Sequence, residues 1–335
     1  MTSSSSTTCA DAGFAPAPGL ANGHVMTIAA WARRRRFRAL PPADVRFVAV
    51  DAESQVRADC FWQANRARPT LLCLHGLEGS SEAHYMRGLA DKGWQRGWNV
   101  VLLNQRNCGG TEHLTPGLYH SGLTADPVAV LRALQAETPI SRLVIAGYSL
   151  GGNLTLKLAG EAASAPDLPI VGVAVVSPTI DLSLCVDAIE APANMLYQWN
   201  FVRGLKARMR RKAVAWPGRF DISPLARIRT IRQFDDSYTA PHHGFGTAAN
   251  YYHQASALRV TQQIEIPALI VAADDDPFVP TSQYMRDEVR SNPHIVVHLA
   301  RHGGHCGFIG RHAEGHDGYW AEARVIDFLA DSLAR

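Results

Sequence analysis

The chain has 335 residues, of which 47% are hydrophobic and 19% are charged, and its formal net charge is +3. This balance is typical of a globular protein with one large domain or two ordinary ones, and so small an excess of positive charge predicts no polyanionic partner by itself. Apolar runs stay well short of the roughly 20 residues of a transmembrane helix, so we expect no membrane span.

The first 20 residues are Ser/Thr-rich and then Ala/Pro-rich, which predicts a disordered or extended lead-in at 1–20. They lack the basic region and apolar core of a signal peptide. The six cysteines form no CxxC pair, and Cys73 falls in an apolar run that favours a buried free thiol. A reducing compartment fits this cysteine usage best, and we expect a cytoplasmic protein.

Strand and helix patterns alternate along the chain. Residues 45–50 and 56–62 flank a turn-like segment and predict an antiparallel pair at a sheet edge. Buried strands are expected at 70–76, 98–104, 142–147, 170–177, 266–274 and 294–300. Helices are expected at 81–96, 127–136, 154–163, 281–289 and 319–333. This rhythm predicts an α/β fold with a mostly parallel central sheet and helices on both faces.

The alternation is interrupted between about residues 177 and 262. Apolar residues there are interleaved with lysine and arginine, and the stretch contains no buried-strand run. We therefore expect an inserted, largely helical cap at 178–262. On this interpretation the α/β core consists of a first part at 21–177 and a second part at 263–335.

Residues 147–151, Gly-Tyr-Ser-Leu-Gly, match the pattern G-x-S-x-G where a predicted buried strand turns into a predicted helix. In that context the serine occupies a sharp, strained turn, and the glycines remove side chains that would clash there. The helix N-terminus behind the turn favours developing negative charge. Ser149 is therefore predicted to be a nucleophile rather than part of a packing turn.

A serine nucleophile needs a general base, and the base needs an orienting acid. In an α/β-hydrolase the acid and then the histidine follow later strands, and this chain has both in that order. Asp276 is the preferred acid, because the proline after it steers the chain into the loop that faces the histidine. Asp275 is the nearest alternative, and Asp274 is expected to end the strand.

Two histidines follow the next predicted strand. His305 is preferred to His302 as the base, because Gly303 and Gly304 form a flexible turn that carries it over the sheet. The negative charge on the substrate oxygen would be stabilised by backbone amides. We expect these amides to belong to Leu150, directly after the nucleophile, and to Leu77, in the glycine-rich loop after the strand at 70–76.

Several segments together resemble the YheT-type α/β-hydrolase family: HGLEGSSEAHYMRGLA, NQRNCGGTE, YHSGLTAD, GYSLGGN, FDDSYTAPHHGF, DDPFVP and HGGHCGF. The resemblance covers nearly everything after about Phe14. It implies an α/β-hydrolase fold with serine esterase activity and supports Ser149, Asp276 and His305 as the triad. The sequence departs from the family at NQRNCGG, where an Arg-Gly-Cys-type run is more usual. That family also includes acyltransferases and lipases, so the resemblance leaves the substrate open.

Pocket residues are expected among His75, Tyr119 and Tyr148. His120 is a further candidate, although for the Tyr119–His120 loop packing is the simpler interpretation. The cap residues Met195, Leu196, Trp199 and Phe201 suggest an acyl pocket but could equally be core. The pair Asp235 and Asp236 lacks the spacing of a metal site and favours helix capping or a cap-to-core contact, so we expect no metal and no cofactor.

The leading hypothesis is hydrolysis of lipophilic carboxylic esters of short to medium acyl chain through an acyl-enzyme. Acyl transfer to an alcohol needs the same triad, and acylglycerol or phospholipid lipase activity is a further alternative. A non-catalytic binding protein fits poorly because every triad position is occupied. The run Arg33–Arg36 is interpreted as a solvated surface turn, which predicts no nucleic-acid partner but leaves peripheral lipid contact open.

Overall fold

The computed structural model describes residues 9–11, 13–37, 39–312 and 317–335. The expected lead-in therefore lies partly outside the described residues. Within them, β1 (Cys9–Asp11) pairs in parallel with β9 (Ile295–Ala300). Phe14 then packs its ring against Phe308 and Trp320, at centroid distances of 5.7 and 5.4 Å.

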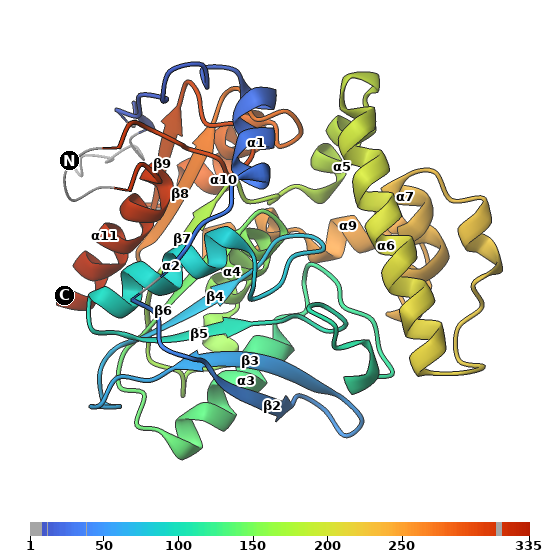
Figure 1. Cartoon of the computed structure of the whole chain (residues 1–335), viewed down its shortest axis with the longest axis horizontal. Coiled ribbons are helices and arrows are strands. Elements are labelled where there is room, and N and C mark those ends of the chain that lie inside the picture. Colours follow the sequence, from blue (N-terminus) through green and yellow to red (C-terminus); the bar gives the residue numbers. More distant parts are fainter. Residues whose placement is uncertain (1–8, 12, 38, 313–316) are drawn as a thin grey trace.

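A single twisted sheet forms the centre of the molecule (Figure 1). Its other strands are β2 (Asp44–Ala49), β3 (Gln55–Phe61), β4 (Thr70–Leu74), β5 (Asn99–Leu103), β6 (Leu143–Tyr148), β7 (Ile170–Val176) and β8 (Ala268–Ala273). They lie in the order β1-β9-β8-β7-β6-β4-β5-β3-β2. The pairs β2–β3 and β3–β5 are antiparallel and the remaining pairs are parallel. The predicted parallel sheet with an antiparallel edge is confirmed.

Helices cover both faces of this sheet, as predicted. On one face lie α2 (His84–Gln95) and α11 (Trp320–Ala334), and on the other lie α3 (Ala125–Glu137) and α4 (Leu150–Gly160) (Figure 1). Strand β4 shows how the sequence builds both layers, because alternate side chains point to opposite faces. Leu71 and Cys73 join the cluster under α2 and α11, whereas Leu72 and Leu74 join the cluster under α3 and α4.

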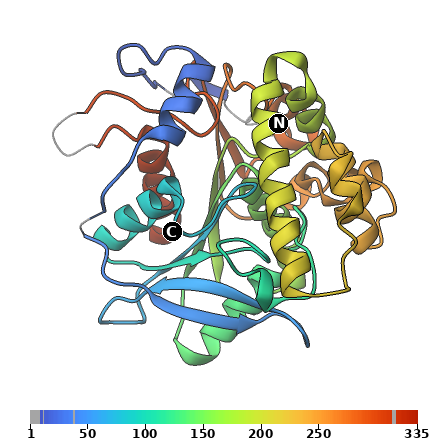
Figure 2. The same cartoon turned by 45° about the vertical axis from the view of Figure 1, so that its right-hand side comes forward.

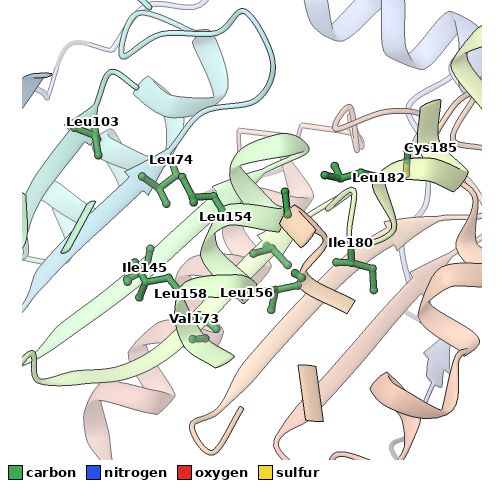
Figure 3. Close-up of a cluster of buried hydrophobic side chains, with 14 of the residues drawn as sticks. Leu74, Leu103, Ile145, Leu154, Leu156, Leu158, Val173, Ile180, Leu182 and Cys185 are labelled. Carbon is green, nitrogen blue, oxygen red and sulfur yellow. The ribbon is translucent and has the colours of Figure 1, made fainter. Parts of the chain in front are cut away.

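The second of these clusters continues beyond the sheet. Figure 3 shows Leu74 and Ile145 of the sheet against Leu154, Leu156 and Leu158 of α4, with Ile180, Leu182 and Cys185 further along the same cluster. Leu182 and Cys185 belong to α5 (Leu182–Glu190), which follows β7. One apolar core therefore joins the sheet to the helices inserted after it.

Between β7 and β8 the chain leaves the sheet, and we call the helical segment at 182–255 the cap. Besides α5 it contains α6 (Met195–Ala215), α7 (Ile231–Phe234), a π-helical turn (Asp235–Thr239), α8 (Ala240–His242) and α9 (Ala248–Ala255). The cap stands to the right of the sheet in Figure 1. We propose that the insertion as a whole spans 178–262 and includes the cap, and that the core consists of 21–177 and 263–335.

The remaining helices are short or peripheral. They are α1 (Gly23–Ala32), α10 (Asp287–Arg290) and the 3₁₀ turns Glu112–Leu114, Ala162–Ser164, Pro192–Asn194, Ser223–Ala226, Ala257–Arg259, Thr261–Gln263 and Thr281–Met285. The helix expected at 281–289 is thus two short pieces. Arg286 separates them because its backbone is extended, with φ −65° and ψ 146°. Across the residues that the structure describes, no helix has the length and apolar character needed to cross a membrane.

The cap is fastened to the core through α6. The buried Lys212 donates from Nζ to Asn107 Oδ1 at 2.6 Å, to the carbonyl of Glu112 at 3.2 Å and to the carbonyl of Thr115. Arg211 adds an ion pair with the Glu112 carboxylate at 2.6 Å. These contacts hold the long loop after β5 against the cap.

The structure shows the surroundings of the cysteines and of the arginine run. Cys73 is a buried free thiol, as predicted, and so are Cys60, Cys108 and Cys185. The run Arg33–Arg36 is not uniformly solvated: the Arg35 side chain is only 7% exposed and pairs with Glu322 and Asp317. Its guanidinium also covers the Tyr319 ring at 3.4 Å.

Candidate active site

Ser149 stands between β6 and α4 in a backbone conformation that L-residues rarely adopt, with φ +52°. The neighbouring glycines make this turn feasible. A Cβ on Gly147 would lie 2.3 Å from the carbonyl oxygen of Gly151, and one on Gly151 would lie 2.3 Å from the carbonyl oxygen of Leu74. The turn therefore brings α4 closer to the sheet than any other residue at these positions would allow, and it projects the serine from the strand end.

His305 and Asp276 complete a hydrogen-bonded chain with this serine. His305 Nε2 lies 3.0 Å from Ser149 Oγ, and His305 Nδ1 lies 2.9 Å from Asp276 Oδ2. The Asp276 side chain is only 2% exposed. Its other oxygen, Oδ1, accepts from the amides of Phe278 and Val279 at 3.1 and 3.0 Å. The carboxylate is thus held in one orientation toward the imidazole.

Asp275, the alternative acid, has different partners. Its Oδ1 accepts from the amide of Gly304 at 2.8 Å and its Oδ2 lies 3.2 Å from His302 Nδ1. Asp274 Oδ1 accepts from the Thr281 hydroxyl at 3.3 Å. Of the three aspartates, the structure places Asp276 against His305, and it pairs the rejected candidates Asp275 and His302 with each other.

The loop that carries His305 rests on α1. The Thr27 hydroxyl accepts from the His305 amide at 2.8 Å and donates to the carbonyl of Gly23 at 2.6 Å. A Cβ on Gly23 would lie 1.7 Å from the carbonyl oxygen of Asp275, so only glycine permits this approach. This contribution could not be predicted, because nothing in a weakly apolar segment far from His305 in sequence signals a contact with it.

The protonation of His305 is shifted by its surroundings. Burial alone would lower the pKa of His305, but the adjacent Cys306 and the Asp276 carboxylate outweigh it and raise the pKa above that of a free histidine. A raised pKa makes the imidazole a stronger base toward the Ser149 hydroxyl. It also means that the neutral, proton-accepting form is reached only at higher pH.

The candidate oxyanion donors lie beside the serine. Leu150 is the first residue of α4, and the amides of a first helical turn have no acceptor within the helix. A Cβ on Gly76 would lie 3.2 Å from Ser149 Cβ, so the loop after β4 directly adjoins the nucleophile. Leu77 and Leu150 both line the same cavity as Ser149.

His75 lies under this loop rather than in the cavity. It is fully buried, its Nδ1 lies 2.8 Å from the carbonyl oxygen of Gly76, and its Nε2 accepts from the Gln105 amide at 3.1 Å. Burial lowers the pKa of His75 to about 4, so its ring is neutral and donates through Nδ1. Instead of contacting substrate, as expected, His75 fixes the loop that presents Leu77.

Tyr148 likewise lies outside the cavity. It is the last residue of β6 and points to the sheet face covered by α2 and α11, where its ring stacks on Tyr85 at 4.5 Å. The strand alternation explains the difference, because Tyr148 and the cavity lie on opposite faces. Tyr119 does line the cavity, as expected, and so does His120.

A cavity of about 90 Å³ opens at Ser149 and extends between the sheet and the cap. Most of its wall is apolar and comes from α5, α6, α7 and the loop after β8: Leu182, Cys185, Val186, Ile189, Phe201, Leu205, Ile231 and Phe278. Phe201 therefore lies where the acyl-pocket interpretation expected it. Met195, Leu196 and Trp199 do not; they are exposed on the outside of α6.

Another part of the wall is polar, and sequence reasoning did not find it. Arg208 of α6 pairs with Glu78 at 2.5 Å and places its guanidinium 4.5 Å from the centroid of the Tyr119 ring. Asp235 accepts from the Tyr252 hydroxyl at 2.7 Å. Burial raises the pKa of Asp235 to about 6, although hydrogen bonds with Thr239 and Tyr252 act against the increase. Its neighbour Asp236 caps α9 by accepting from the Ala248 amide at 2.6 Å.

Among the described residues, no group of three or more histidine, cysteine, aspartate or glutamate side chains is arranged to hold a metal ion. The candidate site thus consists of a nucleophile, a base, an acid, two backbone donors and an apolar cavity.

Comparison with known proteins places this arrangement in a family. Residues 69–311 match the family model described as alpha/beta hydrolase fold. A protein of Escherichia coli (strain K12) named "Putative esterase YheT" is 35% identical over 326 residues, which cover 96% of this chain and 94% of that protein. "Phospholipase ABHD3" of Mus musculus is 29% identical over 263 residues, which cover 76% of this chain and 64% of that protein.

Solved structures show the same fold. The Pyrococcus furiosus esterase Pf2001 superposes with a TM-score of 0.56 at 17% identity, covering 89% of this chain and 99% of that one. With a matching family model over most of the chain and a relative aligned along nearly its full length, the resemblance seen in the sequence is confirmed. The chain belongs to the α/β-hydrolase fold family and is a YheT-type member of it.

Proposed function

We propose that this chain is a serine hydrolase that cleaves lipophilic carboxylic esters, of short to medium acyl chain, through an acyl-enzyme. What carries the proposal is the hydrogen-bonded chain Ser149–His305–Asp276, which opens on a mostly apolar cavity. The names of the relatives support an ester substrate, since one is called an esterase and another a phospholipase.

In the proposed mechanism, His305 Nε2 takes the proton of the Ser149 hydroxyl as Oγ attacks the ester carbonyl. Asp276 holds the ring by its Nδ1 and stabilises the imidazolium that forms. The amides of Leu77 and Leu150 donate to the oxyanion of the tetrahedral intermediate. His305 then gives its proton to the leaving alcohol, and a water molecule activated by the same nitrogen releases the acid from Ser149.

The test is replacement of the nucleophile. With p-nitrophenyl butyrate as substrate, we expect Ser149→Ala to remove turnover and labelling by a fluorophosphonate probe. Ser164→Ala, the same change at an exposed position beyond α4, is the matched control and should behave as wild type. Turnover by Ser149→Ala at the wild-type rate would refute the assignment.

A second candidate is lipase activity on acylglycerols or phospholipids, favoured by the polar wall at Arg208 and Asp235 beside the apolar one. An apolar wall suits an acyl chain and a polar wall suits the rest of a lipid. Comparing turnover of a monoacylglycerol, a phosphatidylcholine and p-nitrophenyl butyrate separates the two candidates. Acyl transfer to an alcohol uses the same residues, and product analysis with a competing alcohol distinguishes it from hydrolysis.

A further inference from the structure

Six of the large apolar side chains that the structure leaves exposed lie on α1 and on the first turns of α6. On α1 they are Val25, Ile28 and Trp31, and on the first turns of α6 they are Met195, Leu196 and Trp199. Trp31 is 75% exposed and Leu196 is 76% exposed. Monomeric proteins rarely expose so many large apolar side chains close together unless these side chains form an interaction site.

The two helices are neighbours. The His24 ring of α1 stacks on the Tyr197 ring of α6 at 5.7 Å, and its Nδ1 lies 3.1 Å from the Tyr197 hydroxyl. Ile28 and Trp31 follow His24 at spacings of four and seven residues, so they share its side of α1. Figures 1 and 2 both show α1 and the beginning of α6 at the same end of the molecule. We call the six exposed side chains the α1/α6 rim.

The rim borders the candidate active site. The Tyr197 ring lies 5.1 Å from the Phe278 ring, and the Phe278 ring lies 4.3 Å from the His305 ring. On its other side, α1 carries Thr27, which holds the His305 loop. The same two helices therefore present apolar side chains outward, while inward α1 contacts His305 directly and α6 approaches it through Phe278.

Exposed positive charge flanks the rim. The segments 12–43 and 191–220, which contain the two helices, hold 12 of the 33 lysines and arginines and none of the 30 aspartates and glutamates, and five of the twelve are buried or paired with carboxylates of other segments. The rest of the chain, with 21 basic and 30 acidic residues, has a net charge of −9. Arg33, Arg34 and Arg36 are exposed directly after Trp31, and the exposed Arg203 lies 5.0 Å from the centroid of the Trp199 ring.

We propose that the α1/α6 rim docks this protein on an anionic phospholipid surface. Tryptophan with adjacent arginine is the combination suited to a membrane interface, where the ring sits among headgroups and the cation pairs with anionic lipid. A second copy of this chain is the weaker alternative, because a symmetric contact would bring the exposed arginines beside Trp31 and Trp199 of both copies together and cost repulsion. The inference goes beyond the proposed function and does not depend on the triad.

The proposal is tested by flotation of the full chain with vesicles of equal parts phosphatidylglycerol and phosphatidylcholine, and with phosphatidylcholine alone. We expect wild type to float with the anionic vesicles, and about 1 M salt, where the screening length is about 3 Å, to weaken binding. The variant Ile28→Gln/Trp31→Gln/Leu196→Gln/Trp199→Gln should reduce the bound fraction at least tenfold. Phe47→Gln, at an exposed apolar site on β2, is the control and should bind as wild type.

Two measurements separate membrane docking by the α1/α6 rim from ester hydrolysis at Ser149. Ser149→Ala should still float, and the quadruple variant should keep wild-type turnover of soluble p-nitrophenyl butyrate, since none of the four residues lines the cavity. Failure of wild type to bind anionic vesicles would overturn the docking proposal, as would equal loss of binding in Phe47→Gln. So would a wild-type dimer in size-exclusion chromatography with light scattering that the quadruple variant abolishes, because it would assign the rim to a second copy.

Discussion

At the scale of single residues, two adjacent aspartates have separate tasks. Asp276 contacts the His305 ring, whereas Asp275 contacts the backbone of the loop that carries it. Their chemistry is identical, and only the direction in which the turn after β8 points each carboxylate distinguishes them. Three consecutive aspartates in the sequence do not show which carboxylate faces the histidine, and mutation should distinguish Asp275 from Asp276.

Asp276→Asn should lower kcat/KM on the order of 10⁴-fold, because the amide cannot stabilise the imidazolium and favours the wrong tautomer. Asp275→Asn should cost far less, since an asparagine oxygen can still accept from the Gly304 amide. Steady-state kinetics with p-nitrophenyl butyrate measures both. A larger loss in Asp275→Asn than in Asp276→Asn would reverse the assignment of the acid.

The raised pKa of His305 predicts the pH dependence of the reaction. Because the neutral ring is the proton acceptor, kcat/KM should rise with pH, and the midpoint of that rise should lie above 6.5, the pKa of an unperturbed histidine. Asp276→Asn removes a negative charge that raises the pKa and should move the midpoint to lower pH. A wild-type midpoint below 6.5 would contradict the electrostatic argument.

At the scale of elements, the close approach of α4 to β4 and β6 depends on glycines. A Cβ at Gly151 would meet the backbone carbonyl oxygens of Leu74 and His75 at 2.3 and 2.5 Å, and backbone cannot move aside as a flexible side chain can. In α6, by contrast, a Cβ at Gly204 would meet only the Glu78 side chain, at 3.2 Å.

Gly151→Ala should therefore destabilise the fold by about 2–3 kcal/mol, the usual cost of overpacking. Gly204→Ala is the matched control, and a gain of up to about 1 kcal/mol is expected because alanine is the better helix former. Urea denaturation followed by circular dichroism measures the two changes. Equal stability of both variants would mean that α4 has room to move away from the sheet.

At the scale of the whole molecule, cap and core are joined both by a shared apolar cluster and by the buried Lys212. Lys212→Met would leave Asn107 Oδ1 and the carbonyl of Thr115 without this donor, at a cost of about 3 kcal/mol, whereas the carbonyl of Glu112 would keep the Trp216 indole N–H. Lys206→Met, on the more exposed side of the same helix, should change stability by less than about 0.5 kcal/mol. Thermal unfolding followed by circular dichroism compares them.

Lys212 also predicts how the stability of the fold depends on pH. Burial lowers the pKa of Lys212 to about 7 from the value of 10.5 in an exposed lysine. Between these values the folded state binds fewer protons than the unfolded state, so stability should rise with pH from about 7 to about 10.5. Lys212→Met lacks this titrating group, so the difference in unfolding free energy between wild type and the variant should grow with pH across this window. A difference that stays constant across the window would contradict the prediction.

How much of this could be predicted from the sequence depends on how local the signal is. Ser149 was identifiable because its turn chemistry is confined to a pentapeptide, and the mostly parallel sheet followed from apolar runs buried on both faces. His75 and Tyr148 were misplaced because the face on which a side chain emerges depends on register and loop path. Thr27 and Arg208 were missed because their partners lie far away in sequence and share no pattern with them.

The contact between Gly23 and the carbonyl of Asp275 has a practical consequence for protein engineering. Removal of residues 1–32 would leave every triad residue in place but take away the hydroxyl that holds the His305 amide and the helix against which that loop packs. A shortened chain of this kind should fold its sheet yet turn over esters poorly, whereas removal of residues 1–8 alone should leave turnover intact. Libraries that vary the start of this enzyme would therefore select for activity at a segment that holds none of the predicted triad residues.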